Sequence, residues 1–140
     1  MKRQILIIDR SWSKLNAIKG LLVAWGGVHL EDIITTNDAE DGVKKVLSEE
    51  PGKYVVIINR GVVGKSGFEI LKEIKQEQEE TPCILTSSLP IEEEEKKKAR
   101  DLGAIGYFEF IKIALDPAIR DIFVEVTLDA ADGKIETVSV

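Results

Sequence analysis

The chain has almost no cysteine or histidine, the residues from which zinc sites and thiol redox sites are built. Its 140 residues include one cysteine, Cys83, and one histidine, His29. A single thiol excludes an internal disulfide, and one cysteine with one histidine cannot form a zinc cluster or a Cys–His dyad. The apolar neighbours of Cys83 favour a buried, unreactive thiol. Because the lack of disulfides suits a reducing compartment, we expect a cytoplasmic protein.

Long hydrophobic runs and basic stripes are also missing. No apolar run reaches the roughly 18 residues that a membrane span needs, and the N-terminus does not have the pattern of a signal peptide. The net charge is −6, and the basic residues form no stripe. We therefore expect neither a membrane nor a nucleic acid as partner. The residues that are present, 44% hydrophobic and 31% charged, are typical of one globular domain.

Strand-like and helix-like segments alternate along the chain. Short apolar runs predict strands at residues 5–8, 33–36, 55–58, 83–86 and 106–108. Apolar residues at helical spacing predict helices at residues 13–25, 38–47, 68–74 with the charged stretch that follows, 90–102 and 117–126. In the first of these helices the spacing places Trp25 in the core. The alternation predicts a parallel sheet that is covered by helices on both faces.

The C-terminal region allows two interpretations. Residues 124–128 and 134–140 flank Asp132-Gly133 and could form a hairpin. The apolar spacing from Ile119 to Val126 is helical, however, and favours a helix followed by an extended tail. We accordingly expect a domain at residues 1–128 and a tail or the start of a linker at 129–140.

In a sheet of this kind, ligands bind beyond the carboxyl ends of the strands. The residues at these ends are Asp9 and Arg10 after the first strand, Asn59 and Gly61 after the third, Ser87 after the fourth and Phe110 after the fifth. No glycine-rich loop follows the first strand, which argues against a dinucleotide site or a P-loop.

Five segments, in order and with the right spacing, carry a resemblance to a known family. They are ILIIDR, NDAEDGVKKVL, INRGVVGKSGFEIL, PCILTSS and ARDLGAIGYFEF, and they extend over residues 2–126. Together they resemble the receiver (CheY-like) domain of bacterial response regulators. The resemblance implies an α/β, flavodoxin-like, doubly wound sheet of five parallel strands with five helices, the (βα)5 receiver fold.

The family's site residues are matched incompletely. By resemblance, Asp9 matches the first metal-binding acid, Gly61 the backbone ligand of the metal, Ser87 the Ser/Thr that contacts the phosphoryl group, and Tyr107 the aromatic switch. Arg10 stands at the second acid and Asn59 at the phosphoacceptor. Phe110 and Ile111 replace the lysine and the proline that follows it. Lys112, two residues beyond Phe110, could serve as a displaced lysine if the strand continues.

These departures predict a changed electrostatic character. The site would offer Mg²⁺ only one carboxylate, that of Asp9, so we expect no bound metal and no other cofactor. Mg²⁺ would bind only if the site still functions as in a conventional receiver. Our hypothesis is that the guanidinium of Arg10, or with less support Arg60, supplies the positive charge that the metal would bring. An amide cannot form an acyl phosphate, so Asn59 indicates a receiver without a phosphoacceptor and without enzyme activity.

The resulting function is a phosphorylation-independent protein-interaction module of two-component signalling. The expected partner is a histidine kinase or a signalling output protein, bound through the fourth helix, fifth strand and fifth helix, close to Tyr107 and Phe110. Three alternatives remain open: a conventional Mg²⁺-dependent phosphorylatable receiver, a small nucleotide- or flavin-binding protein of the same architecture, and a homodimerisation module.

Overall fold

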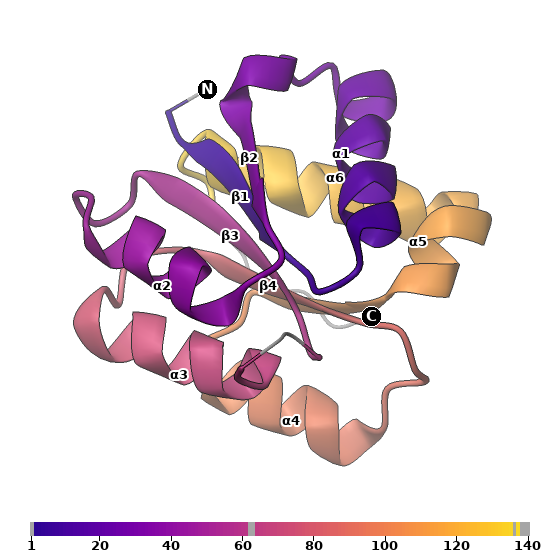
Figure 1. The fold of residues 1–140 in the computed structure, drawn as a ribbon. Helices are drawn as coiled ribbons and strands as arrows, with labels where there is room; N and C mark the ends of the chain where they lie inside the picture. The colour runs from indigo at the N-terminus through magenta and orange to yellow at the C-terminus, as the bar shows by residue number, and fades with distance from the viewer. Residues whose placement is uncertain (1, 62–63, 136, 138–140) are drawn as a thin grey trace.

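The computed structural model describes residues 2–61, 64–135 and 137. Five parallel strands form one sheet in the order β2-β1-β3-β4-β5 (Figure 1). The strands are β1 (Gln4–Ile8), β2 (Ile33–Thr36), β3 (Tyr54–Asn59), β4 (Cys83–Ser87) and β5 (Gly106–Glu109). Strand β1 lies between β2 and β3, with Ile5 opposite Ile33 and Val55. The predicted five-stranded parallel sheet of the flavodoxin-like class is therefore confirmed.

Six α-helices are found in the described part of the chain, one more than predicted. They are α1 (Trp12–Gly26), α2 (Ala39–Leu47), α3 (Gly67–Glu77), α4 (Glu93–Asp101), α5 (Phe110–Leu115) and α6 (Pro117–Ala131), with a 3-10 turn, η1 (Leu30–Asp32), before β2. The additional helix, α5, directly follows β5. Helix α4 begins at Glu93 and not at Pro90, because Ile91 packs against the core and Glu92 stays extended.

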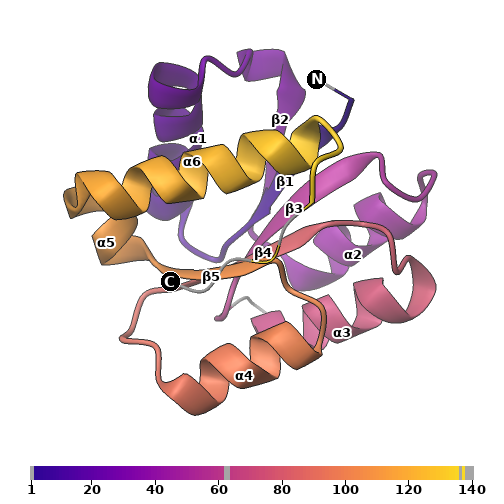
Figure 2. The same ribbon diagram turned by 180° about the vertical axis from the view of Figure 1, so that it is seen from behind.

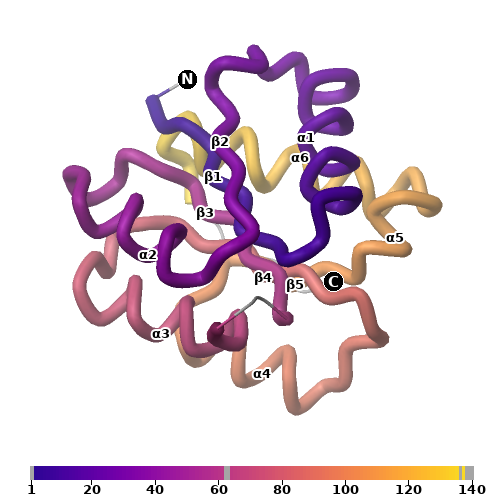
Figure 3. Tube along the Cα trace, viewed as in Figure 1, coloured from indigo at the N-terminus to yellow at the C-terminus, as the bar shows by residue number. Residues whose placement is uncertain are grey.

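The helices form two layers, which the opposite views of Figures 1 and 2 and the trace in Figure 3 show. Helices α1, α5 and α6 cover one face of the sheet, and α2, α3 and α4 cover the other. Alternate residues of β1 point into the two cores: Ile5 and Ile7 into the first, Leu6 and Ile8 into the second. No helix within these described residues is long and apolar enough to cross a bilayer.

The C-terminal segment is helical through Ala131, so the helix was the correct alternative and residues 124–128 form no hairpin strand. Asp116 caps α6 by accepting a hydrogen bond from the Ala118 N–H (3.0 Å), and Pro117 occupies the first turn, where its missing N–H costs nothing. The expected domain end at residue 128 remains a prediction. Part of the expected tail, residues 136 and 138–140, lies outside the described residues.

The expectation of a buried Trp25 is wrong. Its side chain is 64% exposed, and the Arg120 guanidinium carbon lies 4.9 Å from the ring centroid. Gly27 ends α1 in the left-handed conformation (φ 65°) and reverses the chain. This turn buries Val28, whose N–H donates to the Leu22 carbonyl, in the core position that helical spacing assigned to Trp25.

Candidate functional site at the carboxyl edge of the sheet

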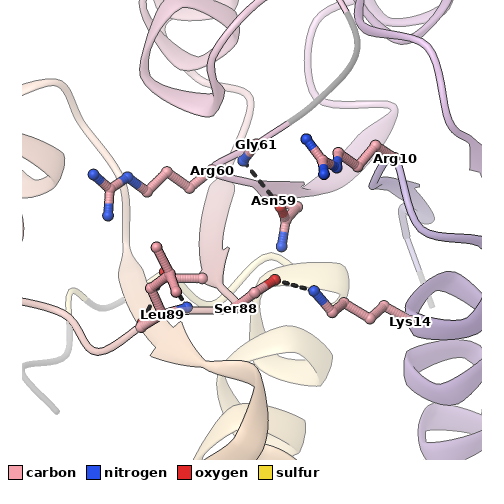
Figure 4. Close-up of a pocket in the computed structure, with 8 residues that line it drawn as sticks. Arg10, Lys14, Asn59, Arg60, Gly61, Ser88 and Leu89 are labelled. Carbon is pink, nitrogen blue, oxygen red and sulfur yellow. Dashed lines mark hydrogen bonds between the residues drawn. The ribbon is translucent and has the colours of Figure 1, made fainter.

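A cavity of about 430 Å³ lies at the carboxyl ends of β1, β3 and β4. We call it the carboxyl-edge pocket. Its lining consists of Arg10, Lys14, Asn59, Arg60, Gly61, Ser87, Ser88 and Leu89. Figure 4 shows Arg10 and Lys14 approaching from the side of β1 and α1, with Lys14 joined directly to Ser88 by a hydrogen bond and the Asn59 amide nearby. Four of the residues that the sequence placed in the site, Arg10, Asn59, Gly61 and Ser87, thus line one cavity.

Asn59 is 4% exposed, and both polar atoms of its amide form a hydrogen bond. Nδ2 donates to Thr86 Oγ1 (3.3 Å), and Oδ1 accepts from the Gly61 N–H (2.9 Å). The second bond is the local turn that Asn side chains commonly form with backbone two residues ahead. Asn59 is therefore held by neutral hydrogen bonds on both sides of its amide.

A close approach between β3 and α3 fixes the backbone around Asn59. The Gly67 N–H donates to the Arg60 carbonyl (2.6 Å), and Gly61 forms a bridge with Ser66. A Cβ atom at position 67 would lie 2.6 Å from the Asn59 carbonyl oxygen. Glycine is required here because no other side chain fits against this backbone.

Asp9 is buried behind the pocket, at 1% exposure. Its Oδ1 accepts from the Ser11 N–H (2.9 Å), while its Oδ2 is buried without a hydrogen-bond partner. Burial raises the pKa of Asp9 above its usual value, and the Ser11 hydrogen bond and the charges of Lys14 and Arg10 oppose this effect only in part.

Arg10 is exposed and lines the pocket, and it makes no hydrogen bond or ion pair with any residue in the described part of the chain. It does not pair with Asp9, whose Oδ2 has no partner. Arg60, in contrast, is committed: its Nη1 lies 2.7 Å from Glu95 Oε2 on α4. The two guanidinium groups therefore differ: Arg10 brings an unpaired positive charge to the pocket, whereas the charge of Arg60 is partly neutralised by Glu95.

Ser87 and Tyr107 are both buried. The Ser87 hydroxyl donates to the Leu89 carbonyl (2.9 Å) and accepts from the Leu89 N–H (3.1 Å). The Tyr107 hydroxyl lies outside the pocket lining and donates to Glu95 Oε2 (3.3 Å). Burial and the adjacent Glu95 carboxylate raise the pKa of Tyr107 to about 12. Arg60, Glu95 and Tyr107 thus form a continuous polar chain from the pocket to β5.

Phe110 and Lys112 lie outside the pocket lining. Strand β5 ends at Glu109, and Phe110 begins α5, where it packs against the first core. The idea that Lys112 replaces the missing lysine required β5 to continue to residue 112. It is wrong, because the strand ends three residues earlier. Because position 112 is helical, the Lys112 ammonium points back to Glu109 Oε2 (2.7 Å), three residues earlier.

Sequence reasoning missed Lys14, Ser88 and Leu89. Lys14 is in the first turn of α1, and its ammonium donates a hydrogen bond to Ser88 Oγ. The same ammonium lies 5.8 Å from the centroid of the Phe110 ring. The available signal was its position: the helix that follows β1 starts at the carboxyl edge, so a long side chain in its first turn can reach the pocket.

Mg²⁺, which the receiver resemblance implies, does not fit these residues. It prefers several oxygen ligands in octahedral geometry. The unpartnered Asp9 Oδ2 could supply one ligand, but every charged residue in the pocket lining is cationic. Among the described residues, no three His, Cys, Asp or Glu side chains come together as a metal-binding group.

No protein-family model matches the chain, and no curated protein matches it. Solved structures do. A receiver domain from Rhodospirillum rubrum superposes with a TM-score of 0.74 at 16% identity, over 98% of this chain and 99% of that one. The beryllofluoride-activated DrrB receiver domain matches with a TM-score of 0.70 at 25% identity, over 92% and 99%. The beryllofluoride-activated NtrC4 receiver domain, a dimer, matches with a TM-score of 0.72 at 19% identity, over 96% and 99%. The chain has the fold of CheY-like receiver domains.

Proposed function

We propose that the chain is a receiver module of two-component signalling that binds a protein partner without phosphorylation at the end of β3. The observation that carries this proposal is the Asn59 side chain, which occupies the strand end with both of its polar groups hydrogen-bonded. A neutral amide is a poor nucleophile, so it cannot take a phosphoryl group as a carboxylate does.

The surroundings of Asn59 support the same function. Phosphoryl transfer relies on cations that neutralise charge on the moving group, usually with a metal bridging its oxygens. Here the lining cations Arg10 and Lys14 stand without the carboxylates that would hold a metal. Asp9 is the one acid behind the pocket, and burial disfavours its charged form by raising its pKa. The chain would therefore act without catalytic activity of its own.

A partner surface is available along β5. This strand is at the edge of the sheet and is visible between α4 and α6 in Figure 2. A shallow groove there is lined by Ile91, Lys96, Tyr107, Phe108, Glu109, Lys112 and Ile119. We call it the β5 groove. Because Tyr107 joins the groove to Glu95 and Arg60, the groove and the pocket share one polar chain. A histidine kinase or an output protein that binds here would contact a surface whose conformation is set by the Arg60–Glu95 ion pair and not by a phosphoryl group.

A phosphodonor experiment tests the absence of phosphorylation. The protein is incubated with acetyl phosphate and MgCl₂, beside a conventional receiver domain as positive control, and both are examined by intact-protein mass spectrometry. We expect the mass of one added phosphoryl group on the control alone. A phosphoryl adduct on this chain, located between β3 and α3, would show that it is a conventional receiver.

A second experiment tests the surface. Partners captured with the wild-type protein are titrated against K96E and K112E, which reverse charges in the β5 groove, and against K44E on the exposed side of α2 as the matched control. We expect a weakened complex for the two groove variants and an unchanged one for K44E. Equal binding by all three variants contradicts docking at this groove.

A further inference from the structure

We infer that the carboxyl-edge pocket binds the dianion of a small phosphate monoester, without a metal ion. This inference extends the proposed function, since it requires that Asn59 is not phosphorylated. It assigns to the pocket a noncovalent anion held by side-chain cations, in place of a covalent phosphoryl group held with a metal ion. Three features carry it: the charge of the lining, the hydrogen-bond donors that remain available, and the size of the cavity.

The lining charges are all positive. Arg10, Lys14 and Arg60 are its only charged residues, and no carboxylate faces the cavity from the described residues that line it. Cations that share a cavity repel one another, and an anion between them removes this cost. The chain therefore keeps an arrangement that a bound anion would stabilise.

Arg10 supplies the first set of donors. Its guanidinium has no partner among the described residues and extends along the cavity in Figure 4. A planar guanidinium can donate two parallel hydrogen bonds to two oxygens of one phosphate, which makes it the preferred side chain for this group. An exposed arginine with no partner has no evident role in stability, so a ligand role explains its position better.

Lys14 supplies the second set. One of the three ammonium protons is used by Ser88 Oγ, which leaves two for a ligand. Both Ser88 and the adjacent Phe110 ring restrict this side chain, so less conformational freedom is lost when an anion binds. The Ser88 hydroxyl, exposed at the cavity wall, can itself turn toward a phosphate oxygen.

Two acidic residues, Glu95 and Asp9, would repel a bound phosphate. Their repulsion is weakened because neither side chain lines the cavity. Glu95 lies outside the lining and engages Arg60 through a 2.7 Å contact, so Arg60 contributes only part of its charge. Asp9 lies behind the wall and also outside the lining. Removing the Glu95 charge should therefore free Arg60 and tighten phosphate binding.

The cavity volume favours a small ligand over a macromolecular one. At about 430 Å³ it is in the range of small-molecule sites, which start at about 300 Å³. It exceeds the size of inorganic phosphate, so the ester group has room beside Leu89. A phosphorylated segment of a protein would need a longer groove than this cavity provides.

The experiment is a titration of the 15N-labelled full chain with inorganic phosphate and with glycerol 3-phosphate, each with MgCl₂ or with EDTA. Sodium acetate at equal ionic strength is the control. We expect saturable shifts of the Gly61, Ser88 and Leu89 amides for both phosphates, tighter for glycerol 3-phosphate, and the same with EDTA. Binding should weaken as NaCl increases, because salt screens exposed charges.

Four variants complete the test. R10Q and K14Q should each weaken glycerol 3-phosphate binding by about tenfold, since each removes a charge-assisted hydrogen bond. K19Q, on the same helix and outside the lining, makes the same charge change and should leave affinity unchanged. E95Q should tighten binding several-fold.

The outcomes separate this inference from the proposed function. Absence of saturable shifts, dependence on Mg²⁺, or equal affinity of K14Q and K19Q overturns the phosphate site and leaves the proposed function intact. Tight binding of inorganic phosphate with no gain from the ester overturns the monoester assignment. A covalent phosphoryl adduct in the phosphodonor experiment overturns both.

Discussion

Two polar regions at opposite edges of the sheet differ in how fully their groups are paired. At the amino edge, Gln78 and Thr81 form a closed cluster. Gln78 Nε2 donates to the Val46 and Glu49 carbonyls (3.1 Å each), and its Oε1 accepts from the Thr81 hydroxyl (2.8 Å). Thr81 Oγ1 in turn accepts from the Gly52 N–H. Each polar atom of these two side chains has a partner within the chain.

At the carboxyl edge the pairing is incomplete. Asp9 Oδ2 is buried without a partner, Arg10 makes no contact of its own within the described residues, and Lys14 keeps donors to spare. Unpaired buried groups reduce stability, and proteins keep few of them. The difference indicates that the Gln78–Thr81 cluster serves the fold, whereas the carboxyl-edge pocket is available for a ligand.

The largest effect is expected from breaking the closed cluster. Q78A would remove three hydrogen bonds, two to the Val46 and Glu49 carbonyls and one from the Thr81 hydroxyl. We expect the free energy of unfolding to fall by about 3 kcal/mol, from three lost hydrogen bonds at about 1 kcal/mol each. Urea denaturation followed by circular dichroism measures it.

Gln76 provides the matched control, since it lies two residues earlier, in the last turn of α3, and is exposed. Q76A should change the stability by less than about 0.5 kcal/mol. If Q78A and Q76A unfold at the same urea concentration, the cluster does not have the structural role that its hydrogen bonds imply.

The fold was largely predictable because the secondary structure that the local sequence favours is also the one that the packed sheet requires. The apolar runs that became β1 and β3 are too short for helices, and Asp38, a residue type that favours helix starts, caps α2 with Oδ1 accepting from the Glu40 N–H (2.8 Å). Failures occurred where tertiary packing decides. Trp25 has core spacing but loses its place to Val28, and α5 forms in a segment that could have extended β5.

The site was predictable in part. The strand-end residues Arg10, Asn59 and Ser87 follow from the topology of parallel sheets. Lys14 was missed because its place in the first turn of a helix shows that its side chain can reach the pocket but does not show which way it points. Its ammonium lies above Phe110, which the resemblance places at the family's lysine, so the lysine of this pocket comes from α1 and not from β5.

A smaller change in stability, this time an increase, is expected from removing the buried charge of Asp9. D9N keeps the oxygen that accepts from the Ser11 N–H and removes the buried negative charge. Because burial raises the pKa of Asp9, the wild type loses stability as the pH rises through that raised pKa. We expect D9N to be more stable by about 1 kcal/mol at pH 7. Below the ordinary pKa of 3.8 both states are protonated and the gain disappears.

Urea midpoints between pH 3 and pH 8 test this pH dependence. D121N, an exposed change on α6, should show no comparable gain at pH 7. A loss of stability in D9N at neutral pH would mean that the Ser11 hydrogen bond and the charges of Lys14 and Arg10 outweigh the cost of burying the Asp9 carboxylate.

The smallest effect concerns the ion pair that connects the pocket to the β5 groove. Arg60 and Glu95 are partly exposed, so a double-mutant cycle with R60A and E95A should give a coupling energy of about 0.5 kcal/mol. The Tyr107 hydroxyl shares the Glu95 carboxylate, so Y107F should lower this coupling only slightly. The measurement is informative because phosphate competes with Glu95 for Arg60. Repeating the cycle in saturating glycerol 3-phosphate should reduce the coupling toward zero, whereas an unchanged coupling would mean that Arg60 takes no part in binding the ligand.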